Sequence, residues 1–145
     1  MSSSTNKPEK RFWIISTVAL IWNLMGVNLY LQQAYHTESF RAMLTDEQFE
    51  LIQTTPSWVI AAYAFAVFGG MIGCILLLFR KRLAKIFFII SLLGIIIQHV
   101  VYNIFIVNVM ELFGPGSIIM PMMVIAIGGF LVWYTNKSIT KKWLA

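Results

Sequence analysis

Amide, imidazole and phenol side chains interrupt two otherwise apolar segments of the chain. They are Asn23, Asn28, Gln98, His99, Tyr102 and Asn103. Such groups donate and accept hydrogen bonds without carrying a permanent charge. If they converge, they would bind a small neutral polar molecule, whereas acid–base or nucleophilic catalysis needs a positioned base or an activated nucleophile.

Two interpretations of these side chains stay open. In the first, they hydrogen-bond helices to one another, at about 1 kcal/mol per bond, and no ligand is involved. In the second, they line an outward-facing cavity for a solute. His99 presents the same choice: it could relay a proton or sense pH, or it could be a neutral imidazole bonded to a neighbour.

The chain has few residues that could carry out catalysis or bind a metal ion. Cys74 is the only cysteine, so an internal disulfide or a reactive thiol pair is excluded and a packing role is expected for it. His36 is the only other histidine, and no set of His, Cys and carboxylates gathers at one depth. No nucleophile has a base and an orienting acid beside it. We therefore predict no enzyme, no cofactor and no metal.

The segments that carry the polar residues are long and apolar. The chain is 59% hydrophobic and 12% charged, more apolar than a soluble domain of 145 residues. Four stretches reach the roughly 20 residues that a helix needs to cross a bilayer. They are residues 12–31, 58–79, 86–107 and 117–135, without Asp, Glu, Lys or Arg. Because backbone groups in lipid must be paired, we predict an all-α integral membrane protein with four transmembrane helices.

The basic residues predict how the chain is oriented. Every Lys and Arg except Arg41 precedes the first stretch, joins the second to the third, or follows the fourth. The positive-inside rule then places both termini in the cytoplasm. The chain divides into a cytoplasmic tail (1–11, its first ten residues frayed), a membrane domain (12–135) and a basic cytoplasmic tail (136–145). The net charge of +5 is thus a topology signal, and no nucleic-acid partner is expected.

The first and third stretches repeat one another. Residues 12–16, Phe-Trp-Ile-Ile-Ser, return 75 positions later as Phe-Phe-Ile-Ile-Ser. Ser16, Asn23 and Asn28 correspond to Ser91, Gln98 and Asn103, whereas His99 corresponds to Leu24. We predict two tandem-duplicated hairpins forming a parallel repeat, with the amides at equal depth and a site where the repeats meet.

Small residues in the second and fourth stretches predict close helix packing. They are Ala62, Ala66, Gly69, Gly70, Gly73, Gly128 and Gly129. Pro121 is expected to break one backbone hydrogen bond and kink the fourth helix. Interfacial anchors are expected near the span ends at Trp58, Trp133, Tyr134 and Trp143.

Residues 32–57 form the only sizeable link outside the predicted spans. Thr45 and Gln48 have capping-box spacing and Pro56 follows, which predicts a short amphipathic helix over about residues 46–54. It would be a structural lid or a gate. The shorter link, residues 108–116, ends in Gly-Pro-Gly and is expected to turn tightly.

Four short motifs carry a resemblance to small bacterial four-span membrane proteins. They are Trp22-Asn23-Leu24-Met25-Gly26-Val27, Thr55-Pro56-Ser57-Trp58, Phe68-Gly69-Gly70 and Gly114-Pro115-Gly116. The resemblance extends from Arg11 to Trp133; some of those proteins are loosely labelled as sugar-transporter-like, and it implies no catalytic residues. Small multidrug transporters resemble this chain in size alone, since their membrane Glu in the first helix has no counterpart here.

These patterns lead to two alternative functions for a multi-pass cell-membrane protein, in a bacterial inner membrane by the resemblance. It would bind or transport a small neutral polar solute through an amide-lined cavity between the first and third helices. Four short helices enclose little volume, so an oligomer is expected. The alternative is a non-transporting accessory or scaffolding subunit, whose amides only pack helices and whose outer loop or lipid face recognises a membrane-protein partner.

Overall fold

The computed structural model describes residues 5–106, 111 and 114–145, and the elements within them are all helical. The long helices are α1 (Lys10–Tyr35), α4 (Ser57–Leu78), α5 (Ala84–Ile95) and α7 (Ile119–Thr140). A π-helix, η1 (Ile96–Ile106), continues α5, and a short 3₁₀ helix, η2 (Pro115–Ile118), leads into α7. Four helices are long and apolar enough to cross a membrane, as predicted, and the chain is compatible with a multi-pass membrane protein.

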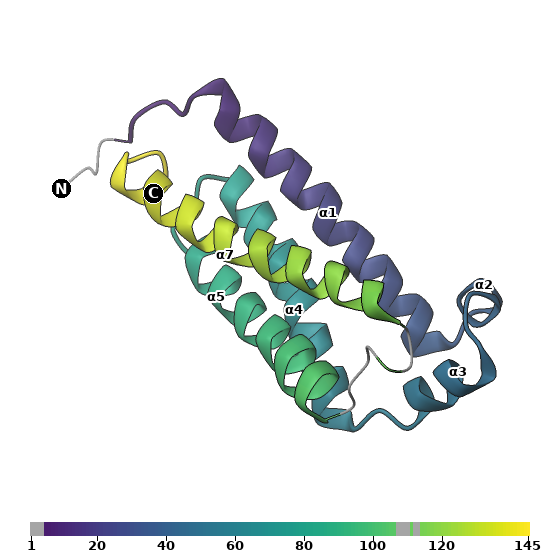
Figure 1. Ribbon diagram of the computed structural model, residues 1–145. Helices are drawn as coiled ribbons and strands as arrows, with labels where there is room; N and C mark the ends of the chain where they lie inside the picture. The colour runs from purple at the N-terminus through teal and green to yellow at the C-terminus, as the bar shows by residue number, and fades with distance from the viewer. Residues whose placement is uncertain (1–4, 107–110, 112–113) are drawn as a thin grey trace.

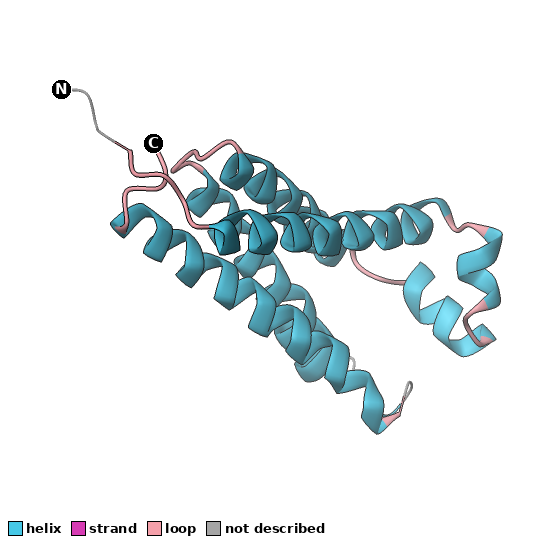
Figure 2. Ribbon diagram, turned by 90° about the horizontal axis from the view of Figure 1, so that it is seen from above, coloured by secondary structure: helices cyan, strands magenta, loops and turns pink. Residues whose placement is uncertain are grey.

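The long helices pack in chain order. α1 lies against α4, α4 against α5, and α5 against α7; among the described residues, α1 and α7 form no contact of comparable extent. Figure 1 shows both ends of the chain at one end of the bundle, called here the termini end, with the α1–α4 link at the far end. Seen from above, α1 and α7 diverge from the termini end toward the far end (Figure 2). The bundle is therefore wedge-shaped, with α4 and α5 as its base.

The α4–α5 contact is made by small residues. A Cβ added to Gly94 of α5 would lie 2.5 Å from the carbonyl oxygen of Ala62 and 3.0 Å from the backbone nitrogen of Ala66. The hydroxyl of Ser91 donates a hydrogen bond to the Ala66 carbonyl oxygen at 2.6 Å. The two backbones approach this closely because no side chain beyond a methyl or hydroxymethyl group stands between them.

Three segments are joined at the termini end. Phe12 of α1 packs against Tyr134 of α7 and against Trp143, with ring centroids 6.5 and 5.8 Å apart. Arg80, in the α4–α5 turn, donates to the Trp143 carbonyl at 2.8 Å and to the Asn6 carbonyl at 2.6 Å. Contrary to the expected fraying, the described N-terminal residues are therefore tied to the bundle.

The predicted interfacial anchors differ in exposure. Trp58 and Trp133 are exposed, whereas Tyr134 and Trp143 are buried in the cluster around Phe12. Helix α7 extends to Thr140, five positions beyond the predicted end of the span, and the chain then turns back so that Trp143 and Leu144 fold under the bundle. Tyr134 and Trp143 thus close the end of the core.

The link between α1 and α4 contains two short helices. α2 (Glu38–Ala42) was not predicted, and α3 (Asp46–Gln53) has both hydrogen bonds of the capping box between Thr45 and Gln48. Arg41 forms an ion pair with Asp46 and lies 4.5 Å from the ring centroid of Phe49. These contacts join α2 to α3, and Figure 1 places the pair beyond the far end of α1. The predicted tight turn at 108–116 lies largely outside the described residues.

Two features of the backbone bear on the predicted helices. Pro121 is the third residue of α7, so its missing N–H falls in the first turn, where no partner within that helix exists. The kink expected at Pro121 stays a prediction. An irregular stretch of backbone lies in η1, whose hydrogen bonds run from i to i+5. That change of register alters which side chains of the third span face the bundle.

Candidate functional site

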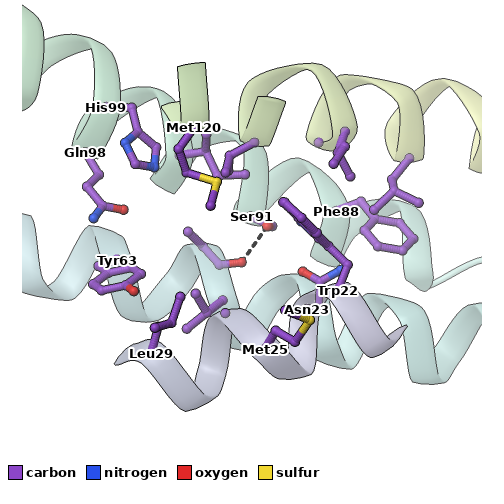
Figure 3. A pocket seen from close by; sticks show the side chains of 18 of the residues that line it. Trp22, Asn23, Met25, Leu29, Tyr63, Phe88, Ser91, Gln98, His99 and Met120 are labelled. Carbon is purple, nitrogen blue, oxygen red and sulfur yellow. Dashed lines mark hydrogen bonds between the residues drawn. The ribbon is translucent and has the colours of Figure 1, made fainter. Parts of the chain in front are cut away.

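A cavity of about 210 Å³ lies inside the wedge, between α1, α4, α5, η1 and α7 (Figure 3). Every long helix contributes to its wall, and no Asp, Glu, Lys or Arg is among the described lining residues. Its lining residues in α1 run from Trp22 to Gln33 and in α7 from Met120 to Leu131. The cavity thus belongs to the middle and far parts of the bundle.

Three of the six predicted ligand-binding residues line this cavity: Asn23, Gln98 and His99. Gln98 and His99 come from η1, and Figure 3 shows their side chains on the same side of the cavity as Tyr63 of α4. The Oε1 atom of Gln98 is buried and accepts no hydrogen bond from the described part of the chain. A buried amide oxygen without a partner costs about 1–3 kcal/mol, so a ligand donor placed against this atom would recover that cost.

Asn23 both joins helices and borders the cavity. Its Nδ2 donates to the Ala19 carbonyl at 2.8 Å and to Cys74 Sγ of α4 at 3.4 Å. A Cβ added to Gly70 would overlap Asn23 Oδ1, so the amide occupies the space that this glycine leaves open. The amide nitrogen of Asn23 therefore bonds within the bundle, as the packing interpretation predicts. The residue also lines the cavity, as the ligand interpretation predicts.

Apolar side chains form the rim of the cavity on the two diverging helices. Met25 and Leu29 of α1 are 59% and 40% exposed, and Met120 of α7 is 53% exposed, although all three line the cavity. Residues that both line a cavity and remain exposed mark its mouth. The mouth therefore opens sideways, between α1 and α7.

Of the other three predicted ligand-binding residues, Asn28 and Tyr102 are not among the described lining residues. Asn28 is exposed; five residues after Asn23 it points about 140° away on an α-helix, so one cavity does not collect both. Tyr102 is buried against Trp58 of α4, with ring centroids 6.0 Å apart. The side chain of Asn103 lies outside the described residues.

Tyr63, Met25 and Met120 line the cavity but are not among the predicted ligand-binding residues. The position of Tyr63 in the sequence could have marked it as a candidate site residue. It lies five residues inside Trp58, which is too far from the predicted span end for an interfacial anchor. Tyr30 packs edge-on against it, with centroids 5.2 Å apart. For Met25 and Met120 no such signal exists, since exposed methionines are ordinary on a lipid-facing helix.

The predicted packing residues fall into two groups. Ala62, Ala66, Gly69, Gly70 and Gly73 are all buried in α4, facing α1 or α5. In α7 the adjacent glycines differ: a Cβ on Gly128 would meet Ile95 and Leu92 at 3.2 Å, whereas one on Gly129 would meet no atom of the described residues within 4 Å. Neighbouring helical residues point about 100° apart, so Gly128 faces α5 and Gly129 points away from it. The packing role predicted for Gly129 stays a prediction.

The arrangement is suited to neutral hydrogen bonding. Among the described residues no group of three or more His, Cys, Asp or Glu is placed to hold a metal ion. The fold and the site together define an all-helical bundle, compatible with a multi-pass membrane protein, that holds a laterally open cavity with amides in its wall. Comparison with models of known protein families, with curated proteins and with solved structures finds no match to this chain.

Proposed function

We propose that the protein binds a small uncharged molecule in the cavity, as a step in moving it across the membrane. The observation that carries this proposal is the placement of the Asn23 and Gln98 amides in the wall of one cavity, whose described lining residues include no Asp, Glu, Lys or Arg. Polar side chains within a membrane span are costly and often serve a ligand or a pathway. An uncharged wall selects uncharged ligands, because a buried ion without a countercharge is strongly destabilised.

The proposed orientation and repeat fit this function. We infer that the termini end is cytoplasmic, since the basic residues of the α4–α5 turn and of both tails gather there. The two hairpins, α1–α4 and α5–α7, would then be parallel repeats, with Asn23 and Gln98 at matching depth. By the resemblance, the membrane would be the inner membrane of a bacterium. An oligomer remains part of this proposal.

One observation favours the accessory-subunit alternative. The Asn23 amide nitrogen is already used within the bundle, by the Ala19 carbonyl and by Cys74 Sγ. If both amides act in this way, the protein would be a scaffold with its partner on the outer loop or the lipid face. Substitutions that separate stability from ligand binding decide between the two functions.

The test compares Gln98→Ala and Asn23→Ala with Asn28→Ala, an amide of the same helix as Asn23 that does not line the cavity. Purified protein is screened with glycerol, urea and monosaccharides for a shift in unfolding temperature, and proteoliposomes are assayed for uptake of any hit. Losing one hydrogen bond of about 0.5–1.5 kcal/mol should weaken binding up to about tenfold. Asn28→Ala should leave binding unchanged.

Two results would contradict the proposal. Equal losses in all three variants would show that the cavity is not where the ligand binds. Lower stability of Asn23→Ala and Gln98→Ala, with no solute shifting the unfolding temperature of the unsubstituted protein, would favour the accessory subunit.

A further inference from the structure

We propose that the ligand is an uncharged amphiphile of the bilayer that carries a hydrogen-bond donor and reaches the cavity sideways, between α1 and α7. This inference rests on the proposed function, and it names both the class of ligand and the route. Three observations carry it: the direction of the mouth, the chemistry of the deep wall, and the size of the cavity.

On the α1 side, the mouth lies within an apolar helix rather than beyond its end. Its rim residues there, Met25 and Leu29, lie in the interior of α1, which runs from Lys10 to Tyr35, whereas Met120, on the opposite side, is the second residue of α7. Both α1 and α7 are long and apolar enough to span a membrane. An opening between two such helices faces acyl chains, so a molecule dissolved in the bilayer reaches it without passing through water.

The deep wall contains a hydrogen-bond acceptor without a partner among the described residues. Gln98 Oε1 is buried and receives no hydrogen bond from the described residues, and the Gln98 side chain borders the cavity beside Tyr63 (Figure 3). A hydroxyl or an N–H group of a ligand would satisfy this oxygen. A carboxylate or phosphate would not, because it offers no donor to Oε1 and finds no Lys or Arg among the described lining residues.

The cavity volume limits how much of the ligand is enclosed. At about 210 Å³ it exceeds the roughly 150 Å³ of a cavity that holds benzene, and it falls below the roughly 300–1,000 Å³ of sites for drug-sized molecules. It therefore accommodates a hydroxyl or amide head group and the first part of an apolar chain. The rest of the chain would leave through the methionine-lined mouth. A helix of a second copy, roughly 10 Å wide, could cover the mouth but not enter the cavity.

Trp22 provides a reporter, because it lines the cavity on the same helix as the rim. The protein in lipid nanodiscs is titrated with terminally brominated octanol, whose bromine quenches tryptophan fluorescence. The fluorescence of Trp22 is the difference between the unsubstituted protein and Trp22→Phe. Two matched probes serve as controls: brominated octane has no hydrogen-bond donor, and brominated octanoate carries a negative charge. We expect saturable quenching by the alcohol, with both other probes at least about tenfold weaker.

Gln98→Leu separates a binding role from a structural one. It removes the acceptor while keeping an apolar side chain of similar size, so quenching by the alcohol should weaken about tenfold. Removing a buried acceptor that has no partner should leave the unfolding temperature unchanged or higher. A variant that instead loses stability, with unchanged quenching, would assign Gln98 to packing and overturn the inference.

The remaining outcomes distinguish this inference from the function on which it rests. If glycerol, urea or a monosaccharide binds and the brominated alcohol quenches no better than brominated octane, the amphiphile is wrong and the proposed function stands. If neither class binds, both fail. A last outcome is that Met25→Cys forms a disulfide dimer in the membrane at full yield while the brominated alcohol does not quench Trp22. A second copy would then cover the mouth, and the inference would be overturned.

Discussion

The α4–α5 contact and the α1–α7 opening lie on opposite sides of one bundle and differ in the size of the side chains that face each other. In the contact, Gly94 and Ser91 meet Ala62 and Ala66, and backbone atoms nearly touch. At the opening, Met25 and Met120 are exposed on helices that diverge (Figure 2). In lipid, apolar side chains gain little by leaving one apolar surface for another, so helices associate where small residues allow close packing. The same chain thus holds two helices together and leaves two others apart.

The largest effect is expected from Gly94→Ala. The added methyl group would lie 2.5 Å from a backbone oxygen of α4, which yields only if α4 and α5 separate. Overpacking of this kind costs about 1–3 kcal/mol and sometimes more. Thermal unfolding in detergent measures it, with Gly129→Ala as the control, because a Cβ there meets none of the described residues within 4 Å. Equal stability of the two variants would show that the contact is not close-packed.

A smaller effect is expected from Gly70→Ala, whose methyl group would displace the Asn23 amide rather than backbone. A side chain can move, so the cost should fall near 1 kcal/mol, at the lower end for overpacking. If the clash with Asn23 is the cause, the double variant Gly70→Ala, Asn23→Ala should be more stable than the sum of the single effects allows. Additive effects in this double-mutant cycle, measured by chemical unfolding, would contradict that contact.

The smallest effect compares two serines at matching positions of the repeat. Ser91 donates to the Ala66 carbonyl, whereas the buried Ser16 hydroxyl has no partner among the described residues. Ser91→Ala should cost about 0.6 kcal/mol, typical of a hydrogen bond between membrane helices. Ser16→Ala should be neutral or slightly stabilising, since it removes an unsatisfied group. A larger loss in Ser16→Ala, measured in the same unfolding assay, would reverse the comparison.

Much of the fold follows from local composition. Each span is an apolar run between charged links, and burial of backbone groups in lipid leaves helix as the available structure, so the four helices and their approximate bounds were predictable. Helix α3 was predictable because its capping box is a local motif. Helix α2 was missed: it has five residues and no apolar periodicity long enough to detect.

The site was only partly predictable because it depends on how the helices turn toward one another. Spacing along an ideal α-helix placed Asn23 and Gln98 toward the interior, and both line the cavity. The same spacing fails for Tyr102, which lies four residues beyond Gln98 and packs against Trp58 instead of lining the cavity. Both residues belong to the π-helix η1, which no local pattern in the sequence predicts. Tyr63 and Met120 join the site through tertiary packing alone.

The segments joined at the termini end also determine how the wedge can move. Backbone hydrogen bonds connect Asn6 to Lys142 at 2.7 Å and Ala145 to Arg80 at 2.7 Å, and Leu144 is fully buried beneath the helices. We infer that a wedge joined at its narrow end would widen by rotation of α1 and α7 about that end. A small angular change there becomes a larger displacement at the mouth, so the residues that set the width of the cavity include some that lie far from it.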